Sequence, residues 1–283
     1  MELGLLACTF NENIALLYSY KNPLDMPKIA IIGGTGIYDP DSFETIKTVF
    51  PDTPYGKPSD EIMIGRIAGV EVAFLTRHGR SHQHPPSGVP YRANMWALKE
   101  LGCEYVISAC AVGSLQIEYA PGDLVIPTQF IDFTKKRDYT FFDKKTVHIS
   151  MPDPFCDCLN RIFVKTAEEM GIKHHLGGTY VCIEGPRFST RAESKMFRQF
   201  GDIIGMTVVP ECQLARELGM CYCSLATITD YDVWHIEDVS IDAVIRTMNE
   251  CLAKVLRLLE LGLPKIKEHD CNCIEAAKGC GAL

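Results

Sequence analysis

A glycine-rich stretch near the start of the chain combines residue types that bind anions. The segment KIAIIGGTGIYDP, residues 28–40, begins with the apolar run Ile29–Ile32, which is typical of a strand buried on both faces. Gly33, Gly34 and Gly36 then free the backbone, and Thr35 between them offers a hydroxyl. Successive backbone N–H groups of such a loop form an anion site. The alternative is a tight turn that binds nothing.

The same loop does not fit either of the two common large phosphate-containing cofactors. A dinucleotide fingerprint requires a third glycine or alanine where this chain has Asp39, which Pro40 follows. A P-loop ends in Gly-Lys-Ser/Thr, and the first lysine after this loop is Lys47. The loop therefore predicts a smaller anion or none.

Polar residues also follow other apolar runs. Arg77 and His78 come directly after VAFLT and before Gly79, which favours a shaped loop that binds phosphate or carboxylate over a surface pair. In GMTVVPE, Met206 and Thr207 precede a predicted helix. Methionine there is typical of a core residue and threonine of a helix cap, although the same geometry offers a hydroxyl to an anion.

The TDYD segment places Asp230 and Asp232 two residues apart after the apolar run YCSLATIT. In an extended chain both carboxylates would point to one side. Paired acids can accept hydrogen bonds from N–H donors, and one of them can act as a general acid. A helix cap or solvated turn is the alternative. Without a metal-like His/Asp cluster nearby, the pair favours recognition of a nitrogen-rich ligand over metal binding.

These residues require a sheet that brings strand ends together. Apolar runs alternate with helical patterns, which predicts an α/β fold, a single domain around one central sheet flanked by helices. Ligands of such folds collect at the carboxyl ends of the strands. The predicted strands are 28–33, 61–67, 71–76, 104–110, 123–127, 178–183 and 220–228, and the predicted helices are 91–102, 155–171, 190–200, 208–219 and 239–261.

Composition excludes several classes of protein. The 283 residues carry a net charge of −8, which argues against a general nucleic-acid binder. No apolar run reaches the roughly 18 residues of a membrane span, and the N-terminus lacks the basic region of a signal peptide. Met26 is a plausible second start, so we expect residues 1–27 to be an extension, either disordered or peripheral. Residues 28–263 form the predicted domain, and 264–283 a tail.

Three of the thirteen cysteines, Cys271, Cys273 and Cys280, lie in this polar tail, whereas most others lie in apolar runs and are typical core residues. With His269 they could supply four zinc ligands, but their spacing matches no standard zinc site. We favour a disulfide within the tail, whose pairing the sequence leaves open.

Ten motifs taken in order resemble one known family. They are IIGGTGIYDP, TPYGKPSD, RHGR, YRANMWALKELG, VGSL, PGDLVIPTQFID, MPDPFC, IEGPRFSTRAES, GMTVVPE and TDYD. Together they look like the 5′-methylthioadenosine phosphorylases, a branch of the trimeric-type purine nucleoside phosphorylases, from about Lys28 to Leu261. The resemblance implies a mixed central sheet, a cytoplasmic homotrimer or homohexamer, and a small-molecule nucleoside as substrate. The tail is similar to that of archaeal members, which would fit a disulfide there.

The family's reaction is attack of inorganic phosphate on C1′ of methylthioadenosine, without a metal or an organic cofactor. Carried over by motif, Thr35, Arg77, His78 and Thr207 would bind phosphate. Asp230 would protonate purine N7 and Asp232 would read the 6-amino group. The nucleoside would contact Met206, Phe188, His148, Ile241, Val244 and Ile245, the histidine from a neighbouring subunit.

The chain departs from the family pattern at Cys110, where members usually offer Thr or Ser to phosphate. A thiol is a weak donor, so the alternatives are a lower phosphate affinity or a contact carried by backbone amides such as that of Ala111. Two other functions stay open: a broader purine nucleoside phosphorylase acting on adenosine, inosine or methylthioinosine, and a nucleoside sensor without turnover. Aspartate at both 230 and 232 favours a 6-amino purine, because a carboxylate disfavours a 6-oxo oxygen.

Overall fold

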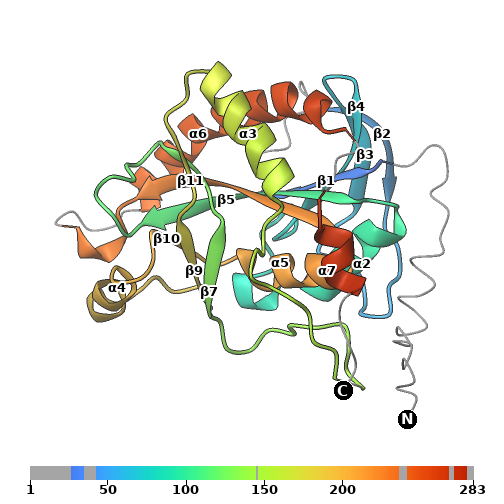
Figure 1. Ribbon diagram of the computed structural model, residues 1–283, viewed down its shortest axis with the longest axis horizontal. Coiled ribbons are helices and arrows are strands. Elements are labelled where there is room, and N and C mark those ends of the chain that lie inside the picture. Colours follow the sequence, from blue (N-terminus) through green and yellow to red (C-terminus); the bar gives the residue numbers. More distant parts are fainter. Residues whose placement is uncertain (1–26, 35–42, 145, 236–240, 268–270, 279–283) are drawn as a thin grey trace, which may run out of the picture.

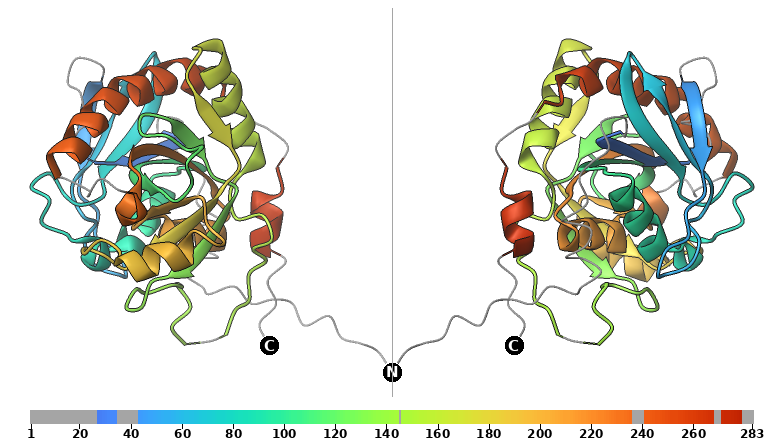
Figure 2. Two further views of the ribbon diagram at one scale, coloured as in Figure 1. Left: turned by 90° about the vertical axis from the view of Figure 1, so that its left-hand side faces the viewer. Right: turned by 90° about the vertical axis from the view of Figure 1, so that its right-hand side faces the viewer.

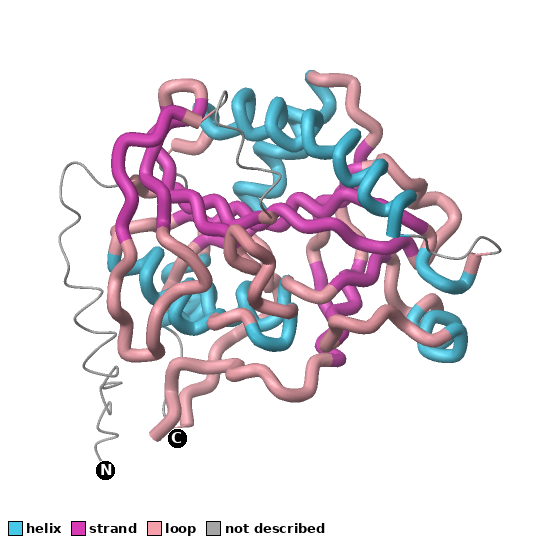
Figure 3. The backbone as a smooth tube through the Cα atoms, turned by 180° about the vertical axis from the view of Figure 1, so that it is seen from behind, coloured by secondary structure: helices cyan, strands magenta, loops and turns pink. Residues whose placement is uncertain are grey.

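The computed structural model describes residues 27–34, 43–144, 146–235, 241–267 and 271–278. Eleven strands form one mixed sheet with helices on both faces (Figure 1). Figures 2 and 3 show the same layering from the sides and from behind, with helix α6 (Ile241–Gly262) running across one face. The central mixed sheet predicted from the sequence is therefore confirmed.

Four parallel strands form the centre of the sheet. β1 (Ile29–Gly33) lies between β4 (Val70–Thr76) and β5 (Tyr105–Ser114), and β5 also pairs with β11 (Cys221–Asp230). Alternate residues of these strands enter different hydrophobic clusters, as period-two geometry requires. Because both faces are covered, the strands read as continuous apolar runs.

The remaining strands extend this centre in both directions. β3 (Ile62–Ile67) pairs antiparallel with β4 and with β2 (Glu44–Val49). On the other side, β10 (Ile203–Gly205) joins β5 to β9 (Thr179–Ile183), and β9 pairs with β7 (Gln129–Phe133). β6 (Leu124–Ile126) connects β11 to β8 (His174–Leu176).

The helices pack in two layers. α2 (Tyr91–Glu100) and α5 (Val208–Glu217) contribute to one buried cluster, and α3 (Asp157–Glu169) and α6 contribute to the cluster on the opposite face. α4 (Arg191–Phe197) begins with a capping box in which Thr190 and Glu193 satisfy each other's backbone N–H groups. The short α7 (Cys273–Lys278) lies in the tail, on the α2 and α5 side of the sheet (Figure 1).

All seven predicted strands and all five predicted helices are present, with ends that shift by a few residues. Sequence patterns did not predict strands β2, β7, β8 and β10, helix α7 or the short 3-10 helices of the described residues. β2 is exposed along most of its length and therefore lacks an apolar run. Within the described residues, no helix is long and apolar enough to cross a membrane. The predicted extension, residues 1–27, lies almost entirely outside the described residues.

Candidate active site

A cavity of about 390 Å³ lies at the carboxyl ends of the central strands. Gly34 and Arg77, which follow β1 and β4, meet there with residues from the C-terminal halves of β5 and β11, as the strand-end argument predicts. Its lining residues come from the glycine loop, the strand ends, the loops before α4 and α5, and α6: Gly34, Arg77, His78, His82, Pro86, Ala109, Cys110, Ala111, Val112, Gly113, Ile183, Phe188, Ser189, Ile204, Gly205, Met206, Thr207, Leu225, Thr227, Thr229, Asp230, Asp232, Met248, Asn249, Leu252 and Val255.

Arg77 is buried at the wall of this cavity, and most of its hydrogen-bonding capacity is already used. Its Nε and Nη2 donate to the two carboxylate oxygens of Glu211 at 2.5 and 3.1 Å. Nη1 donates to the carbonyl oxygen of Ala109, and Nη2 also donates to Ser108 Oγ. A guanidinium has five N–H groups, so these four bonds leave one for a ligand.

Glu211 balances the charge of Arg77 and was not predicted from the sequence. Besides the two bonds from Arg77, its carboxylate accepts hydrogen bonds from Ser108 Oγ at 3.1 Å and from the Tyr222 hydroxyl at 2.9 Å. Burial disfavours the arginine cation, but the adjacent carboxylate overrides this and raises the pKa of Arg77 above its usual value. Sequence reasoning could have found Glu211 as an acidic residue whose neighbours within a predicted helix are apolar.

His78 lies beside Arg77 with a defined tautomer. Its Nδ1 donates to the carbonyl oxygen of His84 at 2.8 Å, so the neutral ring keeps Nε2 as an acceptor. Burial, and secondarily the Arg77 cation, lower the pKa of His78 below its usual value. At neutral pH the imidazole is uncharged, and it can accept a hydrogen bond from a protonated oxygen of a phosphate.

The two aspartates meet at one end of the cavity. Asp230 accepts hydrogen bonds from Thr229 Oγ1 and from the backbone N–H of Asp232, each at 2.8 Å. Asp232 follows in a left-handed conformation with φ of 48°, so a turn, and not the predicted extended strand, brings the carboxylates together. Burial raises the pKa of both carboxyl groups. Gly113 faces them, and a Cβ there would lie 3.1 Å from Asp230 Oδ1.

Three buried polar atoms of the cavity make no hydrogen bond of good geometry within the described residues. They are Thr207 Oγ1, Ser189 Oγ and Asp232 Oδ2. Thr207 stands at the N-cap of α5, yet its hydroxyl makes no capping bond. Thr207 lies beside the Tyr180 hydroxyl and Asp232 beside Ser194, and these contacts oppose the rise in pKa that burial causes in Tyr180 and Asp232. A polar ligand in the cavity would give all three atoms better-aligned partners.

The rest of the cavity is mainly apolar. Met206 and the half-exposed Phe188 lie on it as predicted, and Cys110 and Ala111 contribute the end of β5. Cys110 Sγ lies 3.5 Å from Ser224 Oγ. From α6, the lining residues are Met248, Asn249, Leu252 and Val255, none of which the sequence singled out.

Some predicted site residues do not meet the others in this cavity. Thr35 and the side chains of Ile241 and Val244 lie outside the described residues. Ile245 is 45% exposed and is not among the lining residues, since the lining positions of α6 begin one turn later. His148 lies on a loop and does not line the cavity either.

Comparison with known proteins gives a consistent result. The model of the phosphorylase superfamily matches residues 28–261. The S-methyl-5′-thioadenosine phosphorylase of Pyrococcus furiosus is 59% identical over 255 residues, which are 89% of this chain and 98% of that protein. The corresponding enzyme of Saccharolobus solfataricus is 52% identical over 257 residues, covering 88% and 95%.

Solved structures agree with these relatives. A methylthioadenosine phosphorylase from an Antarctic soil metagenomic library has a TM-score of 0.85 at 45% identity, covering 90% of this chain and 91% of that one. The methylthioadenosine phosphorylase of Schistosoma mansoni, in complex with adenine, has a TM-score of 0.83 at 38% identity, covering 89% and 96%. The family model that matches residues 28–261, together with relatives at 59% identity, shows that the chain belongs to the phosphorylase superfamily.

Proposed function

We propose that this protein cleaves 5′-methylthioadenosine with inorganic phosphate and releases adenine and 5-methylthioribose 1-phosphate. The names of the relatives support this substrate, since several of them, at 50% identity or more, are S-methyl-5′-thioadenosine phosphorylases. The cavity supports it independently, because it combines carboxylates, anion-binding groups and an apolar wall.

The observation that carries the proposal is the pair Asp230 and Asp232 at one end of a largely apolar cavity. Both groups are acceptors when ionised, and Asp232 Oδ2 makes no hydrogen bond of good geometry within the described residues. Adenine presents N–H donors at its 6-amino group, which would satisfy that oxygen. Asp230, whose pKa burial raises, keeps a proton more readily than an exposed aspartate and would donate it to N7.

Phosphate would bind at the other end, against groups that donate to oxygen. We assign Thr207 Oγ1, the remaining Arg77 N–H group and the amide of Ala111 to it, with Cys110 as a weak donor. His78 Nε2 would accept from the protonated phosphate oxygen. Thr35 of the glycine loop would also contact the phosphate.

The nucleoside would lie between these two ends. Met206 would pack under the ribose and Phe188 against the base. Met248, Leu252 and Val255 of α6 would contact the 5′-methylthio group, because a thioether matches an apolar wall and a free 5′-hydroxyl would lack a partner there. Ile241, Val244 and Ile245, and His148 of a neighbouring subunit, remain proposed contacts of the same group.

In the proposed reaction a phosphate oxygen forms a bond to C1′ while the C1′–N9 bond breaks. The electron pair of that bond passes into the purine, and the proton from Asp230 at N7 neutralises the leaving group. The phosphate dianion also stabilises the positive charge that develops on the ribose. The reaction as proposed needs neither a metal nor an organic cofactor.

The alternative is a broader enzyme that also accepts adenosine or inosine. The apolar lining from α6 favours the thioether substrate over a 5′-hydroxyl, and the two carboxylates favour a 6-amino purine over a 6-oxo purine. We further propose a role in purine and methionine salvage, a cytoplasmic location, and a homotrimer or homohexamer, as the family resemblance implies.

The test is product analysis with four nucleosides. Methylthioadenosine, adenosine, inosine and methylthioinosine are each incubated with and without phosphate, and the free base is quantified by chromatography. We expect adenine from methylthioadenosine only when phosphate is present. Absence of phosphate-dependent adenine release would refute the proposal, and nucleoside binding without turnover would favour the sensor.

A variant tests the role of the acid. Asp230→Ala should lower kcat by about 10²–10⁴-fold, the usual contribution of a general acid. Asp52→Asn is the control, because Asp52 is largely exposed and pairs with Lys57 at the surface. Turnover of the Asp230→Ala protein near that of the control would contradict the assignment.

A further inference from the structure

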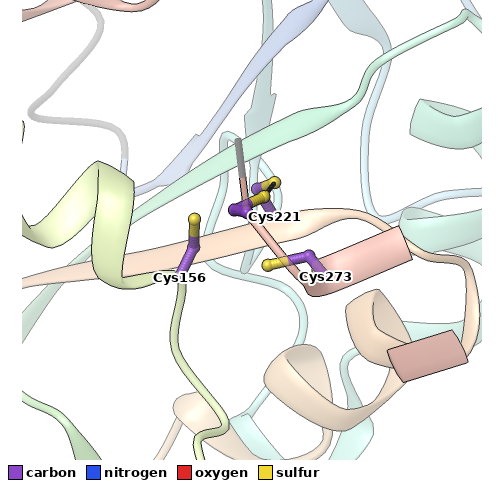
Figure 4. A group of neighbouring side chains, drawn as sticks. Cys156, Cys221 and Cys273 are labelled. Carbon is purple, nitrogen blue, oxygen red and sulfur yellow. Dashed lines mark hydrogen bonds between the residues drawn. The ribbon is translucent and has the colours of Figure 1, made fainter. Parts of the chain in front are cut away.

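Four cysteines from distant parts of the sequence converge on the edge of the sheet away from the cavity. They are Cys156, directly before α3; Cys221, the first residue of β11; and Cys271 and Cys273 of the tail, the latter at the start of α7. All four Sγ atoms lie within 4.8 Å of one another. Figure 4 shows Cys156, Cys221 and Cys273 reaching one shared space from three different elements.

The sulfur positions suit ligation of a shared ion better than covalent pairing. The Sγ atoms of Cys221 and Cys271 are 3.3 Å apart, and the cluster contains no disulfide. With a Zn–S bond of about 2.3 Å, two sulfurs of a tetrahedral site lie about 3.8 Å apart. A small adjustment of the side chains would therefore give each sulfur this separation.

The core holds two of these cysteines in fixed positions. The backbone N–H of Cys156 donates to the carbonyl oxygen of Tyr222 at 2.8 Å, and that of Cys221 donates to the carbonyl oxygen of Glu104 at 2.8 Å. Cys156 is also the N-cap of the thirteen-residue helix α3, and its side chain makes no capping bond. The positive end of that helix favours a thiolate at this position.

The tail completes the set. Cys271-x-Cys273 brings two sulfurs to the two from the core, and Cys273 is buried against the same hydrophobic cluster as Cys156 and Cys221. The sequence alone could not suggest this site, because the tail spacing matches no standard zinc motif and the other two ligands lie 115 and 50 residues before Cys271. Four thiol ligands in closed, mostly buried surroundings are the donor set of a structural zinc site.

We propose that Cys156, Cys221, Cys271 and Cys273 bind one zinc ion, which fastens the C-terminal tail to the core. The role is structural, because β11 separates the cluster from Asp230 by about 30 Å at 3.3 Å per residue. Four protein ligands also leave no open position for a substrate. The ion would take the place of the tail disulfide expected from the sequence.

The first experiment measures metal content. The full chain is purified anaerobically under reducing conditions in metal-free buffers, and zinc is quantified by mass spectrometry. We expect one equivalent per chain in the wild type and its loss in the double variant Cys271→Ser/Cys273→Ser. Cys158→Ser is the matched control, because this cysteine lies two residues from Cys156 but outside the cluster, and it should retain the zinc.

A second measurement does not depend on the folding of a variant. Reconstitution of the wild-type protein with Co²⁺ in place of zinc should give the sulfur-to-cobalt charge-transfer absorption and the visible bands of a tetrahedral tetrathiolate. Absence of these bands would overturn the proposal. Zinc that persists in the double variant, or disulfides among the four cysteines in protein kept reduced, would overturn it as well.

Discussion

The buried pair Arg77–Glu211 leads to a quantitative prediction for Glu211→Gln. Both side chains are at most 2% exposed, and the substitution keeps the shape of the residue while removing its charge. The Arg77 cation would then lie in the interior without a counter-charge. Loss of one partner of a buried pair costs about 3–5 kcal/mol. For a chain of this size that free energy lowers Tm by about 6–20 °C.

Thermal unfolding followed by circular dichroism measures this effect. Glu260→Gln is the control, because Glu260 pairs with Arg257 at 2.7 Å on the surface, where a pair contributes less than about 1 kcal/mol. The variant with both Arg77→Met and Glu211→Met should be more stable than Glu211→Gln, since it leaves no unpaired charge. A Tm decrease of less than about 2 °C for Glu211→Gln would refute the reasoning.

The same variant also tests where phosphate binds. In the wild type the Glu211 carboxylate neutralises Arg77, so only one N–H group remains for an anion. In Glu211→Gln the cation is uncompensated, and an added anion can supply the missing charge. Phosphate should therefore raise the Tm of this variant more than that of the wild type, and an equal increase would contradict the location of phosphate beside Arg77.

Three further predictions concern single residues. Burial raises the pKa of Glu217 from 4.5 to about 7, so the native state holds its proton more tightly than the unfolded state. This group therefore stabilises the protein at low pH. Its contribution to the free energy of unfolding, about 3 kcal/mol, is lost as the pH rises from about 4.5 to 7. Glu217→Gln should remove this pH dependence. Denaturant titrations measure the free energy of unfolding at pH 5 and pH 8, and an equal difference between the two pH values in variant and wild type would contradict the prediction. Gly113→Ala should lower kcat by about 10–100-fold, because the new methyl group displaces Asp230, and should also lower Tm, because it meets the buried Ile204 side chain at 3.1 Å; unchanged steady-state kinetics would show that the carboxylate tolerates the contact. Cys110→Ser should lower the KM for phosphate, since a hydroxyl is a better donor than a thiol, and a KM that is unchanged or raised would argue against contact between residue 110 and phosphate.

Much of the cavity is predictable because it follows from a local pattern repeated along the chain. Each central strand is a continuous apolar run, and the first polar residues after it must lie at the same edge of a parallel sheet. This rule predicts that Arg77 and Asp230 lie close to the glycine loop and to the end of β5, and the cavity contains residues from all four places.

The parts that were missed depend on contacts between distant residues. Glu211 lies 134 residues from Arg77, and nothing in its own neighbourhood identifies it as the partner of an arginine. The contribution of α6 was predicted one turn too early at Ile245, because the apolar stripe of a long helix does not show which turn faces a cavity. β2 was missed because an exposed edge strand has no apolar face to detect.

The ten residues of β11 place the cavity and the cysteine cluster at opposite ends of one strand. One end carries Asp230 at the cavity, the other carries Cys221 among the clustered cysteines, and the strand between them is buried. Under the proposed roles, substitutions in the tail and the cysteine cluster can therefore change how the tail is held without moving the groups that line the cavity. Substitutions at the cavity end of the strand can likewise alter the proposed substrate contacts without disturbing the cysteine cluster.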